Sequence, residues 1–304
     1  MLKRAIVTGA NGFIASNLVQ RLLALGWSVT GVRRSESGRE LGHKGYHEIS
    51  WEEFWKAEPP GETDMVFHLA GYVPANMEDS ACASLCLEGN ALLALRLAEH
   101  VAIGKARLIN ASSGQGYLWQ KQPASEDLPL FPSGRGSIYL SSKLLGEIYV
   151  ERTRLVKGLN AVTFRIGSCY GPGMSSKALI ARFSNAVRQG QPMHLRHGGM
   201  EQFDCVYVGD VVECMVRAAS SNAKGIYNLG SGTASTVKDI ATTVLHVFGG
   251  GTEIIMDDVD EKPLQPGFAP LCMKRCSETF GIMPHSLEEG VLGYKQWLEQ
   301  GGPQ

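Results

Sequence analysis

The chain of 304 residues carries 29 basic and 30 acidic side chains, and 44% of its residues are hydrophobic. This size predicts a large hydrophobic core, in one domain or in two closely joined ones, and the near balance of charge argues against nucleic acid or an anionic membrane surface as a partner. The basic start "MLKR" is too short for a signal peptide, and no run approaches the ~18 apolar residues of a membrane span. The cysteines are scattered, without histidines at metal-finger spacing, which predicts reduced thiols in a cytoplasmic protein without a metal site.

Strand and helix patterns alternate through about the first 165 residues. In chain order, the apolar periodicity predicts a strand at 4–7, a helix at 11–26, strands at 27–32 and 64–71, a helix at 88–102, a strand at 106–112, a helix at 137–156 and a strand at 160–168. This alternation is typical of a parallel sheet with helices on both faces. The predicted fold is therefore a doubly wound α/β (Rossmann) domain.

The patterns after residue 167 are shorter and are interrupted by glycine and proline. We interpret 203–212 and 225–232 as strands followed by loops, and 235–248 as a helix. The expected organisation is a dinucleotide-binding domain at 1–166 and a smaller, mainly substrate-binding portion at 167–304. Its strand segments at about 203–230 are expected to return to the first domain.

The glycine loop "TGANGFIAS" at 8–16 lies between the first strand and the first helix. Gly9 permits a tight turn, Gly12 lets the backbone approach phosphate oxygens, and Ala15 lies where helix and strand pack. The helix N-terminus then faces the anion. This order predicts a site for a dinucleotide pyrophosphate, and a plain tight turn is the alternative.

A second pattern, "YLSSK", places Tyr139 and Lys143 four residues apart, on one face of the predicted helix. A nearby ammonium would lower the tyrosine pKa from about 10, so that the phenol could exchange a proton with a sugar hydroxyl or a carbonyl. A serine of "NASSGQGY", after another strand, could donate to the same substrate oxygen. The alternatives are a chance pair on an amphipathic helix and a loop serine that caps a neighbour.

Together these patterns resemble the extended short-chain dehydrogenase/reductase family, in particular its nucleotide-sugar epimerases and dehydratases. The resemblance covers nearly the whole chain. The motifs that carry it are "TGANGFIAS", Asp64 in "DMVFHLAG", Asn90 in the next helix, "SSGQGY", "YLSSK", "RIGSCYGPG", "FDCVYVGDVV", "YNLGSG" and "SLEEGV".

The resemblance implies a role for individual residues. Tyr139 would be the acid/base, Lys143 would hold the nicotinamide ribose, and Ser113, four residues before Tyr117, would be the catalytic hydroxyl. The residues implied at the cofactor, besides Tyr139 and Lys143, are Gly9, Asn11, Gly12, Phe13, Ile14, Arg33, Arg34, Leu69, Ala70 and Asn90. Those expected at the substrate are Ser112, Gln115, Arg196 and Phe203. His68 is assigned no chemistry, and a homodimer through the helices of Asn90 and Tyr139 is expected.

The chain departs from the family pattern at the substrate. Sugar dehydratases have an Asp-Glu pair where Gly114 and Gln115 stand, which argues against dehydration, and the cysteine that fucose synthases have at position 115 is also missing. Phe203 replaces an arginine that clamps the substrate diphosphate. Arg182, Arg196 or Lys262 could take over that role, or the substrate could be a carbonyl compound without a diphosphate.

The end of the second strand also departs, because Arg33 and Arg34 stand where an NAD-preferring member has an acid. Two cations favour a 2′-phosphate and hence NADP(H) as the cofactor. The alternatives are NAD(H) as the cofactor and a solvated basic loop that binds no ligand. The leading hypothesis is an NADPH-dependent ketoreductase that acts on a nucleotide-activated sugar. The alternatives are a nucleotide-sugar epimerase with tightly held cofactor and a non-catalytic dinucleotide sensor.

Overall fold

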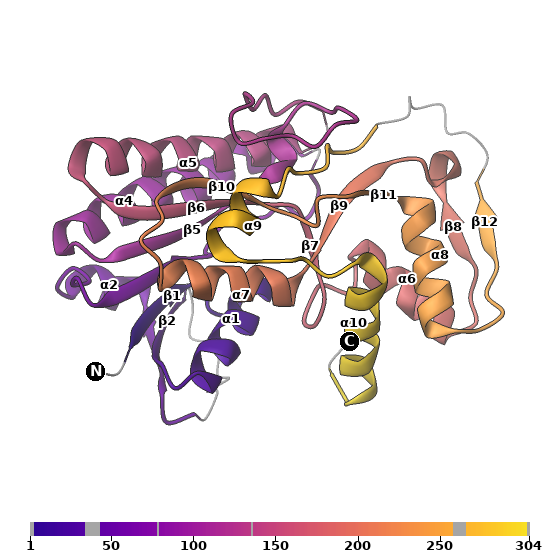
Figure 1. Ribbon diagram of the computed structural model, residues 1–304, viewed down its shortest axis with the longest axis horizontal. Helices are drawn as coiled ribbons and strands as arrows, with labels where there is room; N and C mark the ends of the chain where they lie inside the picture. Colours follow the sequence, from indigo (N-terminus) through magenta and orange to yellow (C-terminus); the bar gives the residue numbers. More distant parts are fainter. Residues whose placement is uncertain (1–2, 34–42, 78, 135, 258–265, 303–304) are drawn as a thin grey trace. The chain divides into compact units, whose positions relative to one another are not determined.

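The computed structural model describes residues 3–33, 43–77, 79–134, 136–257 and 266–302. The chain divides into two compact units (Figure 1). The first unit comprises residues 1–116, 130–165 and 212–227. The second unit comprises residues 117–129, 166–211 and 228–304.

The strands and helices of the described residues follow in chain order. The strands are β1 (Arg4–Thr8), β2 (Ser28–Arg33), β3 (Tyr46–Ser50), β4 (Asp64–His68), β5 (Arg107–Ser113), β6 (Asn160–Ile166), β7 (Ser168–Tyr170), β8 (Met193–Leu195), β9 (Gln202–Tyr207), β10 (Gly225–Leu229), β11 (Ala234–Thr236) and β12 (Ile254–Met256). The helices are α1 (Phe13–Ala24), α2 (Trp51–Lys56), α3 (Ala83–Cys86), α4 (Leu93–Gly104), α5 (Ser137–Lys157), α6 (Leu179–Arg188), α7 (Val208–Ala219), α8 (Val237–Phe248), α9 (Lys274–Phe280) and α10 (Leu287–Glu299). Short turns are η1 (Ser80–Cys82), the π-helical η2 (Leu87–Leu92), η3 (Gly114–Gly116) and η4 (Arg196–Gly199).

A sheet with the strand order β10-β6-β5-β4-β1-β2-β3 forms the centre of the first unit (Figure 1). β1 pairs in parallel with β2 on one side and with β4 on the other. The chain therefore moves outward from β1 to β3 and then returns to β4, so the strand order reverses between β1 and β4. In doubly wound sheets, ligands bind at the carboxyl ends of the strands at this reversal. The predicted Rossmann-type α/β fold is confirmed.

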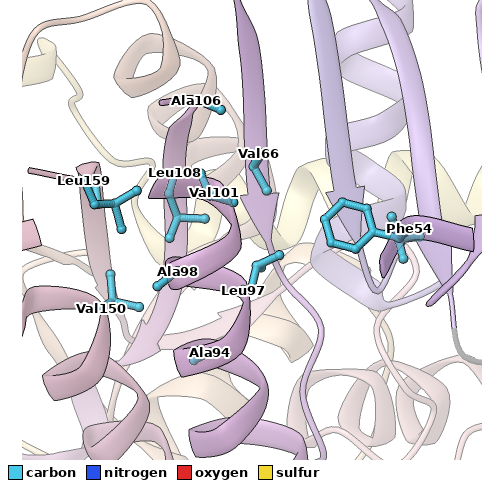
Figure 2. Packing of buried hydrophobic residues seen from close by; sticks show 12 residues of the cluster. Phe54, Val66, Ala94, Leu97, Ala98, Val101, Ala106, Leu108, Val150 and Leu159 are labelled. Carbon is cyan, nitrogen blue, oxygen red and sulfur yellow. The ribbon is translucent and has the colours of Figure 1, made fainter. Parts of the chain in front are cut away.

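A buried apolar cluster joins one face of this sheet to α2, α4 and α5 (Figure 2). Val66 and Leu108 come from β4 and β5, Leu97 from α4 and Val150 from α5, and all four are at most 1% exposed. Burial of such side chains stabilises a fold by about 1.5–3 kcal/mol each. The cluster therefore fixes α5 against the sheet.

Glycines set the ends of α5. Gly136, at φ 79°, precedes Ser137, and Gly158, at φ 71°, follows Lys157. Both φ values lie in the left-handed region, which glycine adopts without a steric penalty. The "YLSSK" motif thus occupies the first two turns of α5.

The segment Ser80–Gly104 is the one stretch among the described residues that is long and apolar enough, by length and composition, to cross a membrane. Its inner side is nevertheless part of the protein core, because Leu97, Ala98 and Val101 are fully buried. The π-helical turn η2 interrupts it and carries Asn90. Such turns are frequent at functional sites.

Some sequence-based expectations are corrected. "FDCVYVGDVV" continues into the helix α7 rather than into a loop, and β3 and α2 were not predicted. Residues 117–129 belong to the second unit although they lie within 1–166. Of the segment at about 203–230, only 212–227 returns to the first unit, because β9 pairs with β7 and β11 in a separate sheet.

The second unit is organised around a buried carboxylate on β9. Asp204 accepts hydrogen bonds from the backbone N–H groups of Ser231 (2.5 Å), Gly232 (3.2 Å) and Leu271 (2.8 Å), and from the Ser231 hydroxyl (2.8 Å). These donors satisfy a charge that would otherwise be costly to bury. Asp204 of the "FDCVYVGD" motif is therefore a structural residue.

Candidate active site

The glycine loop connects β1 to α1 in a conformation that requires glycine. Gly9 has φ 68°, and a Cβ at this position would lie 2.7 Å from the Cα of Ala70. Gly12, which has no side chain, is the N-cap of α1. The first N–H groups of α1 therefore receive no side-chain cap from that position, which is the arrangement found at helix N-termini that bind anions.

The other loop residues predicted at the cofactor surround this turn. Asn11 is exposed, Phe13 and Ile14 are partly buried in the first turn of α1, and Ala15 is 1% exposed against the sheet. The backbone N–H of Ala70 donates to Thr8 Oγ1 (3.2 Å), which links the end of β4 to the end of β1. Leu69 and Ala70, both partly buried, thus lie beside the glycine loop.

A lysine joins the α5 helix to the β5 strand. Lys143 Nζ donates to the carbonyl oxygen of Ala111 (2.6 Å), two residues before Ser113 at the end of β5. Ser113 Oγ accepts a hydrogen bond from the Gln115 N–H (3.3 Å) and stays partly exposed, whereas Ser112 is 7% exposed. Of the two serines, Ser113 is the more accessible residue.

The predicted effect of Lys143 on Tyr139 is corrected. Burial raises the Tyr139 pKa to about 12, and the charge of the nearby Cys86 thiolate form adds to that rise. Burial also lowers the Lys143 pKa to about 8, against the effect of Glu147. Desolvation disfavours both charged forms, and here it outweighs the attraction that the sequence suggested.

Asn90 holds the loop that carries Tyr72. Its Oδ1 accepts from the Tyr72 N–H (2.8 Å), and its Nδ2 donates to the Tyr72 carbonyl (3.0 Å) and to Ser142 Oγ (2.9 Å). Ser142 in turn donates to the Tyr139 carbonyl (2.7 Å). Both amide hydrogens of Asn90 are thus used within the protein, and its contact with the cofactor stays a prediction.

His68, at the end of β4, is buried and hydrogen-bonds Thr8 Oγ1 through Nδ1 (2.9 Å). Burial lowers the His68 pKa to about 3, and the charge of Lys143 acts in the same direction. A neutral imidazole therefore lies near the lysine.

Arg33 forms an ion pair that the sequence did not predict. Its guanidinium contacts the Glu48 carboxylate on β3, and the two side chains are 13% and 11% exposed. Glu48 also accepts from the Tyr46 hydroxyl (2.8 Å). The end of β2 thus presents a compensated charge and not the free cation expected for a 2′-phosphate. Arg34 lies outside the described residues.

The substrate residues predicted in the second unit are placed on several of its elements. Phe203 lies on β9, with its ring 5.8 Å from that of Phe268. Arg196 begins η4 and is exposed, and Arg182, on α6, is also exposed. Lys262 lies outside the described residues. Within the first unit, the structure brings the glycine loop, Ala70, Asn90 and Lys143 together around the ends of β1, β4 and β5, whereas Arg33 lies at the end of β2.

A cavity of about 300 Å³ in the first unit is lined by Gly9, Trp51, Ala70, Gly71, Tyr72 and Leu93, among others. It opens beside the backbone cradle at Gly9, which a Cβ would fill. These features fit a dinucleotide whose pyrophosphate lies on the glycine loop. No group of three or more histidine, cysteine, aspartate or glutamate side chains that could hold a metal ion occurs among the described residues.

A parallel sheet with this loop at its strand-order reversal, followed by a tyrosine and a lysine one helical turn apart, defines a dinucleotide-binding α/β protein of the short-chain dehydrogenase/reductase type. The model of the NAD dependent epimerase/dehydratase family matches residues 5–230. The chain belongs to this family, which confirms the resemblance drawn from its motifs.

Three similar proteins illustrate the range of the family. A UDP-glucose 4-epimerase of Mycolicibacterium smegmatis is 29% identical over 82% of this chain and 84% of its own length. A UDP-N-acetyl-alpha-D-glucosaminuronate decarboxylase of Bacillus cytotoxicus is 29% identical over 99% of both chains. The structure of a UDP-glucose 4-epimerase from Thermus thermophilus in complex with NAD aligns with a TM-score of 0.81 at 26% identity, over 97% of this chain and 99% of that one.

Proposed function

We propose that the chain is an NAD-dependent epimerase of a nucleotide sugar, most simply of a UDP-hexose. The observation that carries the proposal is the bond of Lys143 Nζ to the Ala111 carbonyl (2.6 Å), which joins the helix of Tyr139 to the strand of Ser113. It links the helix of the acid/base and its lysine to the strand of the hydroxyl within the first unit. A UDP-hexose is favoured because the epimerase relatives are named for UDP-glucose.

Tyr139, Ser113 and Lys143 would each have a separate role in the proposed reaction. A bound NAD would supply the hydride acceptor and donor for the sugar carbon, so that the hydride could return to the opposite face. Tyr139 removes the hydroxyl proton of that carbon and later gives it back. Ser113 holds the same oxygen through its hydroxyl, and Lys143 binds the nicotinamide ribose and supports the phenolate with its charge. Arg196 and Phe203 of the second unit stay candidates for substrate recognition.

The proposed cofactor is NAD, although Arg33 and Arg34 led to an expectation of NADP. A 2′-phosphate at the end of β2 would lie beside the Glu48 carboxylate, which repels it and already pairs with Arg33. Glu48 instead offers an acceptor for ribose hydroxyls, from β3 rather than from β2. This arrangement favours a cofactor without the additional phosphate.

Glu48→Gln is expected to shift the cofactor preference toward NADP by roughly 10- to 150-fold. The amide keeps the shape of the side chain but releases the Arg33 charge, and a charge-assisted hydrogen bond contributes about 1.5–3 kcal/mol. Isothermal titration with NAD and NADP at low salt measures the shift. Glu52→Gln, an exposed residue on α2, is the matched control. If the wild-type protein already prefers NADP by about tenfold and the variant does not change that ratio, Arg33 is not restrained by Glu48.

The reaction is tested by incubating the purified protein with UDP-glucose and NAD but without a reductant. An epimerase forms UDP-galactose to equilibrium, with no net NADH absorbance, and it is expected to retain cofactor on purification. UDP-glucuronic acid is offered in parallel, since release of CO₂ would indicate a decarboxylase. Failure to convert any UDP-hexose, UDP-glucuronic acid or N-acetylated UDP-sugar would contradict the proposal.

An NADPH-dependent ketoreductase is the second candidate, and it would require Arg33 to exchange Glu48 for the 2′-phosphate. It differs from an epimerase in needing one NADPH per turnover. Stoichiometric loss of NADPH absorbance with a keto sugar nucleotide would favour it over the epimerase.

We further propose that the protein is a homodimer that pairs through α4 and α5. These helices pack on each other, and yet Leu92 (47%) at the end of η2, Ile103 (72%) on α4, and Ile148 (50%) and Leu155 (68%) on α5 are exposed. Exposed apolar patches of this kind mark interaction surfaces, and a second copy would cover the outer side of the apolar segment Ser80–Gly104. Light scattering should give twice the chain mass of 32.9 kDa. A single chain mass at micromolar concentration would contradict the dimer.

A further inference from the structure

Residues 117–129 form a strap that leaves the first unit and returns to it. They belong to the second unit, although residues 116 and 130, which flank them in the chain, belong to the first. The strap begins after η3, which follows the strand that ends at Ser113, and it leads back toward α5, which carries Tyr139 in its first turn. Ser113 and Tyr139, the two residues proposed to act on the substrate oxygen, are therefore joined by a segment that packs in the other unit.

The two ends of the strap meet within the first unit. The Phe131 N–H donates to the Gly116 carbonyl (3.0 Å). A Cβ on Gly116 would lie 2.8 Å from the Leu130 Cδ2, so glycine lets the returning chain pass close to the departing one. The strap is thus a closed loop whose ends lie side by side, as in Ω-loops. A displacement of the strap would reach the chain on both sides of it together.

One buried asparagine holds the strap at three points. Asn228, on β10, is fully buried, and its Oδ1 accepts from the Tyr117 hydroxyl (2.9 Å) at the start of the strap. Its Nδ2 donates to the Ala124 carbonyl (2.8 Å), and its backbone N–H donates to the Glu126 carboxylate (2.9 Å). An amide offers an acceptor and two donors on one uncharged side chain, which a carboxylate does not. The residue type at position 228 therefore matches both strap groups that its side chain meets.

Two further contacts attach the strap to the second unit. Ala124 forms an isolated β-bridge with Leu271, and the Arg275 guanidinium donates to the Asp127 carboxylate at 2.9 and 3.0 Å. The Asp127 side chain is 79% exposed, so this ion pair contributes little. The buried bonds of Asn228 therefore make a larger contribution to the attachment than the exposed ion pair.

We infer that Asn228 is a positioning residue for the proposed reaction. By fixing the strap, it restrains the chain that follows Ser113 and the chain that leads into α5, and so the positions of the Ser113 hydroxyl and the Tyr139 phenol. Proton transfer requires these groups within hydrogen-bond reach of the reacting oxygen, so a small displacement lowers turnover. This inference rests on the proposed function, which gives Ser113 and Tyr139 their roles.

The test compares Tyr117→Phe and Asn228→Asp with the wild-type protein. Tyr117→Phe keeps a buried ring and removes one hydroxyl bond. Asn228→Asp keeps the shape and the acceptor, but it loses the amide donors and places a second carboxyl group near the buried Glu126. Tyr170→Phe is the matched control, because it removes another buried tyrosine hydroxyl of the second unit, which donates to the Leu287 carbonyl (3.3 Å) at the start of α10.

The strap variants are expected to lose turnover without losing the cofactor. The kcat for UDP-hexose interconversion should fall by roughly 10- to 100-fold in both, since a misplacement of about 1 Å can lower a rate about 100-fold. The dissociation constant of NAD should not change, because the glycine loop and α1 lie outside the strap. Tyr170→Phe should keep both values, measured well below the melting temperature of each variant.

Hydrogen exchange followed by mass spectrometry gives a second readout, which does not depend on turnover. In the strap variants, exchange should become faster in peptides that cover residues 117–131, and also in those that cover η3 and the first turn of α5. In Tyr170→Phe, faster exchange should be confined to the peptides around Tyr170 and the start of α10. A purely local loss of stability in the strap would leave η3 and α5 unchanged.

The outcomes separate this inference from the proposed function. If the wild-type protein interconverts UDP-hexoses and the strap variants keep kcat, lose it together with the NAD affinity, or lose no more than Tyr170→Phe, the role of Asn228 is overturned. Faster exchange within the strap alone overturns it as well. If the wild-type protein converts no UDP-sugar, the proposed function fails, whereas faster exchange at η3 and α5 still supports the restraint by Asn228. Should Asn228→Asp not fold, Tyr117→Phe decides, because it keeps the buried ring.

Discussion

Tyr139→Phe is expected to lower turnover by at least about 10²–10⁴-fold while the affinity for NAD changes little. The substitution keeps the aromatic ring of this residue in the first two turns of α5. It removes only the oxygen that exchanges the substrate proton. The rate of UDP-hexose interconversion and the dissociation constant of NAD are the two measurements. The loss should appear in kcat, since the phenol acts on the transition state rather than in ground-state binding.

Tyr149→Phe on the same helix is the matched control, because it removes a phenol oxygen about three turns further along α5. It should retain nearly the wild-type rate. Substantial turnover by the Tyr139 variant would remove that residue from the chemistry. If both variants lose activity together with the NAD affinity, the damage lies in the helix and not in the proton transfer.

The first unit could largely be predicted from the sequence, because its strands and helices have strong apolar periods. The strand β3 was not predicted because its sequence "YHEIS" mixes apolar and polar residues. It forms an edge strand that is only partly buried. The helix α7 offered a signal, since Val208, Val211, Val212 and Met215 recur at helical spacing and are buried. The capping box at the start of α2 was a second signal that could have been used.

The missed strand also explains why the ion pair between Arg33 and Glu48 was not predicted. Arg33 looked unpaired because Glu48 stands far along the chain, on a strand that was not predicted. The parallel register of β2 and β3 places Glu48 opposite Gly31, two residues before Arg33. Period-2 geometry then puts the Arg33 and Glu48 side chains on the same face of the sheet. Local sequence cannot reveal such a pair without the strand order.

The Tyr139 and Lys143 pKa values show a second limit of the sequence. A four-residue spacing indicates that both side chains share a helical face, but spacing carries no information about solvent. Burial depends on the packing of β5, α5 and η2, whose residues are far apart in the chain. For this reason the two residues could be chosen from the motif, whereas the direction of the tyrosine pKa shift was predicted wrongly.

Arg165→Met is expected to lower the free energy of unfolding by about 3–5 kcal/mol, because it leaves a buried carboxylate without its partner. Arg165 on β6 donates to Glu147 on α5 at 2.6, 3.0 and 3.1 Å, and the two side chains are 7% and 3% exposed. Urea unfolding measures the loss. Arg154→Met, which removes an arginine from the partly buried pair with Glu151, is the matched control and should cost about 1 kcal/mol or less. A loss of the same size in both variants would mean that burial of the Arg165 pair does not matter.

The double variant Arg165→Met/Glu147→Leu separates stability from function. Replacing both partners by apolar residues removes the unpaired charge, so most of the lost stability should return.

The carboxylate that raises the Lys143 pKa is absent from the double variant, and this pKa should fall below its already lowered value of about 8. Because the proposed chemistry uses the lysine as an ammonium ion, activity should be lost at a lower pH than in the wild-type protein, on the alkaline side of the profile. A restored stability with an unchanged pH profile of kcat/KM would show that Glu147 holds α5 on the sheet without tuning Lys143. A restored stability with a shifted pH profile would show that Glu147, one helical turn beyond Lys143, also takes part in the proton transfer by tuning the Lys143 pKa.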